Sequence, residues 1–368
     1  MSIKLPEHHR LLLGAVTDPS SVTGLDNHGW ELLVRLARAA GLLGYLAIEL
    51  ERRALLGEIP EGAAKQLRSG LLEAKKRQQM IRWELDRLHC AVRDTEVKFI
   101  ALKGIAYELA GLPSSEGRIL MDLDVLVPRT GLDQAEAVLL DKGWQFYPIS
   151  VYEEHYYRVW SREIPPMVHK NRKTEIDMHH AITPVVSKLN LDTSLLFEAA
   201  VVGKDGRTKI LAPVDMTLHC AVNLFHNNEI VDDLRDLLDF SDALSFFGQA
   251  PGFWQALIER SNQFGVGKPL FYSLSFARMM LCSPVPERIE YELDQKPGFI
   301  ARRIMNVLVP ATLLPLHPDE PSLYARLARL LLHFRNRWIG MPAHLLVFRV
   351  VRKTYVYVTS ARSSQQPS

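Results

Sequence analysis

The sequence predicts an α+β fold in which a mixed β-sheet lies between two helical regions. Apolar residues recur at helical spacing before residue 95 and again after about residue 190, whereas short β-rich runs fill the segment between them. We therefore expect a helical N-terminal region at 1–95, a core that carries the sheet at 96–190 and a helical C-terminal domain at 191–360. With 368 residues, 47% of them hydrophobic, the chain is long enough to bury a large core.

The N-terminal region is expected to be helical because leucine, alanine, arginine and glutamate dominate it. Its apolar residues follow a helical period in two long stretches, WELLVRLARAAGLLGYLAIELERR (30–53) and AAKQLRSGLLEAKKRQQMIRWELDRLHCAVRD (63–94).

The core begins with a strand, a turn and a helix. VKFIAL (97–102) predicts a short strand, and KGIAYELAG (103–111) predicts a turn followed by a helix that stops at its glycine. MDLDVLV (121–127) predicts a buried strand, and TGLDQAEAVLLDKGW (130–144) predicts the next helix. Four short segments then predict antiparallel strands, with a tight turn at 170–174 between the last two: WQFYPI (144–149), HYYRVW (155–160), PPMVHK (165–170) and TEIDMHH (174–180).

The C-terminal region again shows helical spacing, first in PVDMTLHCAVNLFHN (213–227) and then in VDDLRDLLDFSDALSFF (231–247). Pro213 suits the first turn of a helix. Arg235 and Asp239 have the spacing of an ion pair along one helix, for which a structural role is the default interpretation.

Two aspartates in the strand MDLDVLV need an explanation. Side chains alternate along a strand, so Asp122 and Asp124 point to the same face, where their like charges repel. A divalent cation between them is the simplest partner. Asp177 on the later strand supplies a third carboxylate, and oxygen ligands of this kind suit Mg²⁺. Glu175 lies on the same expected face as Asp177 and is the alternative third ligand.

These motifs, LKGIAYELAG, an arginine, MDLDVLV and EIDMHH, together resemble the nucleotidyltransferase (polymerase β-like) superfamily. More narrowly, they are similar to a bacterial group of uncharacterised nucleotidyltransferases with a leucine-lysine-glycine turn and an Asp-x-Asp strand. The resemblance covers about residues 96 to 180. It implies that Asp122, Asp124 and Asp177 hold Mg²⁺ or Mn²⁺ and that the turn Lys103-Gly104 holds the triphosphate of an NTP.

Several side chains are candidates for nucleotide binding. Lys103 stands where the superfamily has glycine at its Gly-Gly or Gly-Ser turn, and an ammonium at a helix N-terminus calls for an anionic partner. Arg118 either contacts a second phosphate or pairs with Glu116 or Asp122. Strand alternation places His179 on the face of Asp177. His219 and His226 share one side of a predicted helix and either approach the nucleotide or are packed.

The expected function is metal-dependent transfer of a nucleoside monophosphate from an NTP to an unidentified acceptor, which is a small molecule, a protein or RNA, with release of pyrophosphate. The alternative is a non-catalytic nucleotide-binding or RNA-binding module of the same fold, because the altered turn leaves catalytic competence open.

The surroundings in which the protein works are indicated by its composition. The net charge of +2 gives no global signature of nucleic-acid binding, and the three separated cysteines suggest a reduced, cytoplasmic protein. No apolar run is long enough for a spanning helix, so we expect no transmembrane segment. Basic residues gather in a late stretch of the sequence: Arg326, Arg329, Arg335, Arg337, Arg349, Arg352 and Lys353. This stretch is either a solvated helical face or a contact for RNA or for the surface of a membrane.

Overall fold

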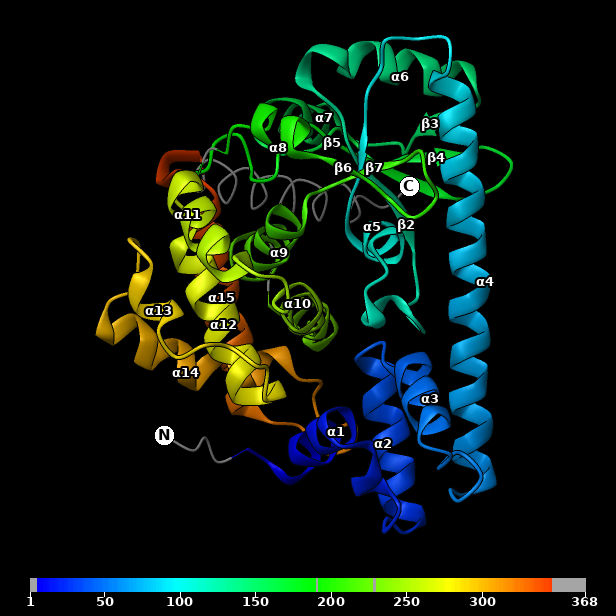
Figure 1. Cartoon of the computed structure of the whole chain (residues 1–368), viewed down its shortest axis with the longest axis vertical. Coiled ribbons are helices and arrows are strands. Elements are labelled where there is room, and N and C mark those ends of the chain that lie inside the picture. The colour runs from blue at the N-terminus through cyan, green and yellow to red at the C-terminus, as the bar shows by residue number, and fades with distance from the viewer. Residues whose placement is uncertain (1–4, 190, 228–229, 346–368) are drawn as a thin grey trace, which may run out of the picture.

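The computed structural model describes residues 5–189, 191–227 and 230–345, and it has the predicted α+β architecture (Figure 1). A seven-stranded mixed sheet occupies the centre of the chain and helices flank it on both sides in sequence. Of the basic stretch, Arg349, Arg352 and Lys353 lie outside the described residues.

The N-terminal region is helical as predicted. It consists of α1 (Glu7–Thr17), α2 (Asn27–Ala39), α3 (Leu43–Arg52) and the long α4 (Glu61–Val92). The helix α4 runs along one side of the molecule, and its buried stripe packs against α3 at one end and against α6 (Leu132–Asp141) and β2 (Asp122–Leu126) at the other (Figure 1). This helix therefore connects the N-terminal helices to the sheet.

The sheet has the strand order β3-β4-β5-β2-β1-β7-β6. The central pair, β2 and β5 (Glu175–His179), is parallel, whereas β1 (Ile100–Ala101) is antiparallel to β2 and β4 (Met167–His169) is antiparallel to β5. The turn predicted at 170–174 between β4 and β5 is confirmed. The edges are formed by β3 (Trp144–Phe146) and by the hairpin of β6 (Val201–Val202) and β7 (Lys209–Ile210), so the sheet takes two strands from beyond residue 190.

One predicted strand is wrong. Residues 155–160 are helical and belong to α7 (Val151–His155) and to a π-helical turn (Tyr156–Trp160). The reason is local, because Ser150 and Glu153 form a capping box in which each side chain satisfies a backbone N–H of the other residue. The alternating aromatic residues of this segment are typical of a strand, but the helix-start signal immediately before them outweighs that pattern.

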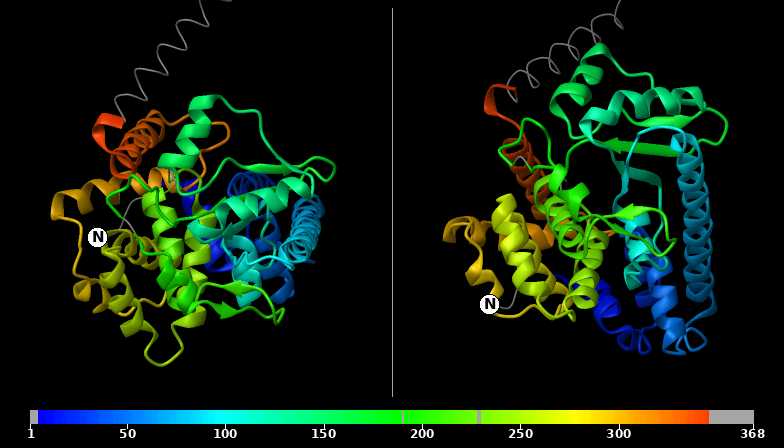
Figure 2. Two further views of the ribbon diagram at one scale, coloured as in Figure 1. Left: turned by 90° about the horizontal axis from the view of Figure 1, so that it is seen from above. Right: turned by 45° about the horizontal axis from the view of Figure 1, so that its top comes forward.

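The rest of the described chain is mainly helical and lies on the opposite side of the molecule from α4 (Figures 1 and 2). Its helices are α8 (Ser194–Ala199), α9 (Pro213–Val222), α10 (Leu234–Phe247), α11 (Phe253–Phe264), α12 (Gly267–Leu281), α13 (Ile289–Glu292), α14 (Phe299–Leu313) and α15 (Leu323–Gly340). Among the helices described, none is both long and apolar enough to cross a bilayer.

Candidate functional site

Three carboxylates meet at the centre of the sheet. In the parallel pair of β2 and β5, Asp124 lies directly opposite Asp177, while Asp122 lies one pleat earlier on the same face of β2. One carboxylate oxygen from each of the three aspartates lies within 4.8 Å of the others. The intervening residues Leu123 and Val125 point the other way and are buried in the core. Strand alternation therefore produces the cluster that the sequence predicts.

The electrostatics of the cluster favour a cation. Burial, followed by repulsion from Asp124, raises the pKa of Asp122 to about 6. Burial, followed by the charges of Asp124 and Glu163, raises the pKa of Asp177 to about 8. These carboxylates are therefore costly to ionise without a positive partner. Oxygen donors with unbalanced negative charge fit Mg²⁺ or Mn²⁺, so the residues present fit the metal that the sequence predicts.

Lys103 supplies one positive charge to this cluster. Its Nζ lies 2.5 Å from Oδ1 of Asp124, and the attraction outweighs the cost of burial, so the pKa of Lys103 is raised. Burial also opposes ionisation of Asp124, but Lys103 and His179 together hold the pKa of Asp124 below its usual range. The sequence predicts an anionic partner for Lys103 at the start of the helix. Among the described residues this partner is Asp124, an acid of the cluster itself.

The backbone at Lys103 is in the left-handed region, with φ of 49°. Glycine is the residue that adopts this conformation without cost, and the superfamily resemblance places glycine at this turn. The next residue, Gly104, is required for space. A Cβ added there would collide with Leu120 and would press on Nε of Arg118 at 3.2 Å. The strand-to-helix turn between β1 and α5 (Lys103–Ala110) is therefore closely packed around these two residues.

His179 positions Asp124. Its Nε2 lies 2.9 Å from Oδ1 of Asp124 and its Nδ1 lies 3.2 Å from Oε2 of Glu163. Both contacts are favourable only if both ring nitrogens carry a proton or the Glu163 carboxyl itself donates to Nδ1, since a neutral imidazole carries a single N–H. Lys103 and His179 both form their hydrogen bonds with Oδ1 of Asp124, and neither forms one with its Oδ2.

Two residues close to this cluster were not predicted from the sequence. Glu163 forms an isolated bridge with His179, and Nε of Arg162 lies 3.5 Å from its carboxylate. Their segment follows the π-helical turn that the sequence suggested as a strand, and only the β-bridge to the end of β5 brings them to the site. The sequence indicates these two residues only by the basic Arg162 standing next to the acidic Glu163. Such adjacent pairs are common on protein surfaces and do not identify a site.

Arg118 has a different partner from those expected. It pairs with Asp239, and its Nη2 lies 3.4 Å from Oδ1 of Asp236, both on α10. Glu116, one of its predicted partners, pairs instead with Arg52. Arg118 still lies beside Gly104, so its position next to the helix α5 is compatible with a phosphate contact.

Glu175, the alternative third ligand, does not belong to the group of carboxylates that lie close together. The hydroxyl of Tyr147 donates a hydrogen bond to Glu175, which lies opposite Asp122 in the strand register. Asp177, rather than Glu175, groups with Asp122 and Asp124.

The two C-terminal histidines have different surroundings. His219 on α9 is buried near Lys103 and His179, and burial, followed by the charge of Lys103, lowers its pKa to about 3. His226 belongs to a π-helical segment (Asn223–Asn227), and its Nε2 lies 2.8 Å from Oγ of Ser187. Only His219 is near the acidic cluster.

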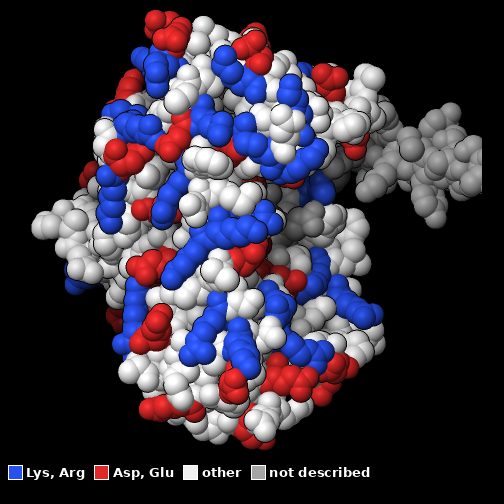
Figure 3. Space-filling view, turned by 90° about the vertical axis from the view of Figure 1, so that its right-hand side faces the viewer, with Lys and Arg blue, Asp and Glu red and all other residues white. Residues whose placement is uncertain are grey.

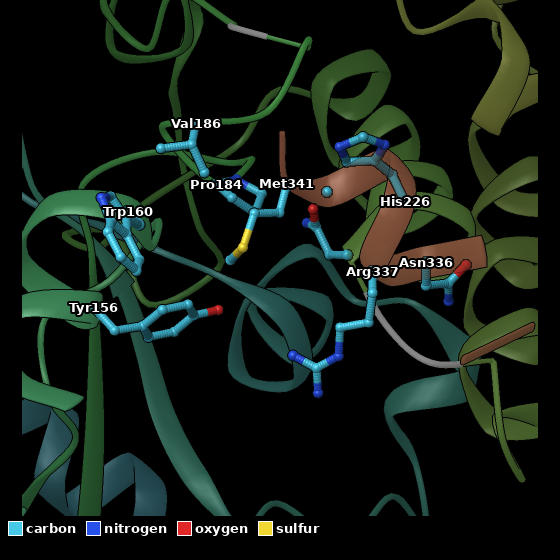
Figure 4. Close-up of a pocket in the computed structure, with 10 residues that line it drawn as sticks. Tyr156, Trp160, Pro184, Val186, His226, Asn336, Arg337 and Met341 are labelled. Atoms are coloured by element: carbon cyan, nitrogen blue, oxygen red, sulfur yellow. The ribbon is translucent and has the colours of Figure 1, made fainter. Parts of the chain in front are cut away.

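A pocket of about 190 Å³ is bordered by His226 (Figure 4). Tyr156 and Trp160 lie on one side, and His226 and Arg337 lie on the other (Figure 4). Aromatic rings with polar side chains around them can receive a planar group such as a nucleobase. Trp160 of this pocket lies two residues before Arg162, whose neighbour Glu163 contacts His179, so a short segment of chain links the pocket to the acidic cluster.

Comparison with known proteins gives one family. The model of an uncharacterised nucleotidyltransferase family matches residues 26–281, which include the helices α2 to α4, the sheet and the later helices up to α12. No curated protein and no solved structure matches the chain. Because the matched segment covers well over half of the sequence, the chain belongs to the uncharacterised nucleotidyltransferase family.

Proposed function

We propose that the protein transfers a nucleoside monophosphate from an NTP to an acceptor and releases pyrophosphate. The observation that supports this most is the convergence of Asp122, Asp124 and Asp177 within 4.8 Å on the parallel strands β2 and β5. The family match supports nucleotidyl transfer in general.

In this proposal the three aspartates hold Mg²⁺ or Mn²⁺, which would neutralise the charge that develops on the attacking and leaving oxygens. Asp177 completes the metal site and accepts the proton of the attacking hydroxyl. The new bond joins the acceptor oxygen to the α-phosphorus, and the bond from that phosphorus to the pyrophosphate oxygen breaks. Lys103, the Gly104 amide, Arg118 and His179 were predicted to bind the nucleotide, and here His179 acts by orienting Asp124.

The test is transfer of label from α-labelled ATP, CTP, GTP and UTP in cell extract, together with Mg²⁺-dependent release of pyrophosphate by the purified full chain. The matched variant carries Asp122→Asn and Asp124→Asn, which keep the side-chain shape and remove the charge. We expect its activity to fall by roughly three orders of magnitude or more, since charge stabilisation is the main contribution in such reactions. Sensitivity of the labelled product to nuclease would identify RNA as the acceptor. Equal activity of the wild type and this variant would contradict the proposal.

One observation favours the non-catalytic alternative. Lys103 already neutralises Asp124, as a structural lysine in a nucleotide-binding module would do. Such a module would bind NTP without releasing pyrophosphate, so the same assay distinguishes the two functions.

A further inference from the structure

The two helices α14 and α15 expose an unusual number of large apolar side chains. On α15 they follow one helical stripe, and Phe334 and Trp338 on this stripe are 60% and 64% exposed. On α14, Ile300 is 73% exposed and continues through Ile304 and Val307 at helical spacing. We call these residues the α14–α15 face: Phe299, Ile300, Ile304, Val307, Leu323, Leu327, Leu330, Leu331, Phe334 and Trp338.

The two stripes form one continuous surface. The helices pack against each other, and a groove of about 830 Å³ between them is lined by Ile304 and Val307 of one helix and by Leu331 of the other. Exposed apolar areas of this extent mark contact sites, because water disfavours them. The face therefore needs a covering partner.

The charge on the two helices of the face has a single sign, and the acidic residue that borders it is Glu320, just before α15, which lines the same hollow as Val307. Neither α14 nor α15 contains aspartate or glutamate, and none follows Glu320 in the whole sequence. Arg303 and Arg326 are exposed beside the two stripes, and neither pairs with a carboxylate in the part of the chain that the structure describes. By contrast, lysine, arginine and acidic residues are interspersed on the side of the molecule formed by α4 (Figure 3). A surface that is both apolar and anionic would therefore complement the face.

We propose that the α14–α15 face docks on a membrane surface that contains anionic phospholipid. Hydrocarbon would accept the apolar stripes, and lipid phosphates would face Arg303 and Arg326. RNA would satisfy the arginines but would leave the aliphatic side chains without an apolar partner. A second copy in a two-fold contact would bring the arginines of one face towards those of the other, and like charges repel. This inference does not depend on nucleotidyl transfer.

The first experiment measures sedimentation of the full-length protein with vesicles of phosphatidylcholine alone and of phosphatidylcholine mixed equally with phosphatidylglycerol. We expect binding to the mixed vesicles and little binding to the neutral ones, with weaker binding at high salt. Phe334→Ser with Trp338→Ser should reduce binding by roughly tenfold or more, since two large apolar contacts are lost. Arg303→Gln with Arg326→Gln should reduce binding to the mixed vesicles alone.

The matched control is Trp83→Ser on α4, because Trp83 is 61% exposed but lies on the surface of mixed charge. This variant should bind as the wild type does. In addition, brominated lipids should quench tryptophan fluorescence of the bound wild type more than that of Trp338→Phe.

Three outcomes would overturn the proposal. The first is absence of binding to both kinds of vesicle, and the second is unchanged binding of the Phe334→Ser, Trp338→Ser variant. The third is a dimer of the wild type that becomes a monomer in this variant while neither protein binds vesicles, which would identify a second copy as the partner. Melting temperatures equal to that of the wild type would show that the exposed substitutions leave the fold intact.

Discussion

At the scale of single residues, the acidic cluster has an electrostatic imbalance. Asp124 is neutralised by Lys103 and oriented by His179, whereas the pKa values of Asp122 and Asp177 are raised to about 6 and about 8. Folded protein therefore retains protons that the unfolded chain releases. Consequently, the contribution of Asp122 and Asp177 to the stability of the metal-free protein should fall as the pH rises from about 4 towards 8, the direction that linkage gives for raised acid pKa values.

Asp177→Asn should weaken this pH dependence. In EDTA at about pH 8, the variant should melt a few degrees higher than the wild type, because one unfavourable charge is removed and each kcal/mol corresponds to roughly 2–4 °C. Mn²⁺ should raise the melting temperature of the wild type but not of the variant. Scanning calorimetry between about pH 5 and pH 8 measures both effects.

Glu175→Gln is the control for this prediction, because Glu175 lies on the same strand but binds Tyr147. It should keep the pH dependence and the response to Mn²⁺. If Glu175→Gln lost the Mn²⁺ response while Asp177→Asn kept it, Asp177 would not be the third ligand.

The sequence predicted the acidic residues of the site, but it did not predict several of the residues that contact them in the folded protein. Asp122 and Asp124 follow from the two-residue period of a strand, which is a local property. Glu163 and Arg162 reach the site through the bridge to His179, a contact between segments that no local pattern encodes. Arg118 was placed near the correct turn, but its ion-pair partners come from a helix more than a hundred residues later, at Asp236 and Asp239.

At the scale of elements, the turn from β1 to α5 combines strain with charge. A lysine in the left-handed region costs about 1–2 kcal/mol relative to a right-handed residue, and Gly104 leaves room for the neighbouring side chains. Sequence patterns located this turn because a β-rich run changes to helical spacing there. They could not give the left-handed backbone of Lys103 or its ion pair with Asp124, because both involve the three-dimensional packing of the turn.

Comparing Lys103→Ala with Lys103→Gly separates these two contributions. Both variants lose the ammonium beside Asp124 and should weaken NTP binding in the presence of Mg²⁺. Lys103→Gly should be about 1 kcal/mol more stable than Lys103→Ala, because glycine adopts the left-handed conformation without strain. Urea denaturation gives the stabilities and calorimetry gives the NTP affinity. Unchanged NTP affinity in both variants would remove Lys103 from the nucleotide site.

At the scale of the whole molecule, buried charges connect the core to the later helices. Arg118, from the loop before β2, pairs with Asp239 on α10, and Arg235 from the same helix donates to the backbone oxygen of Ser114. The predicted pair of Arg235 and Asp239 is present, with 3.2 Å between Nη2 and Oδ1, and both side chains are buried. Burial, followed by the charge of Arg118, lowers the pKa of Arg235 to about 9. This arrangement requires the core and α10 to fold together, which hydrophobic periodicity alone could not indicate.

Asp239→Asn tests how strongly this connection stabilises the fold. The side chain of Asp239 is only 1% exposed, and the substitution keeps its shape while leaving Arg118 and Arg235 without their shared carboxylate. Breaking a buried charge pair by removing one partner costs about 3–5 kcal/mol, so the urea midpoint should fall markedly.

Asp141→Asn is the matched control, because Asp141 pairs with Lys142 on the surface with 74% of its side chain exposed. A surface pair is worth about 1 kcal/mol or less, so this control should unfold close to the wild type. Equal midpoints for the two variants would show that the buried charges do not hold α10 against the core, and the contact would then rest on apolar packing alone.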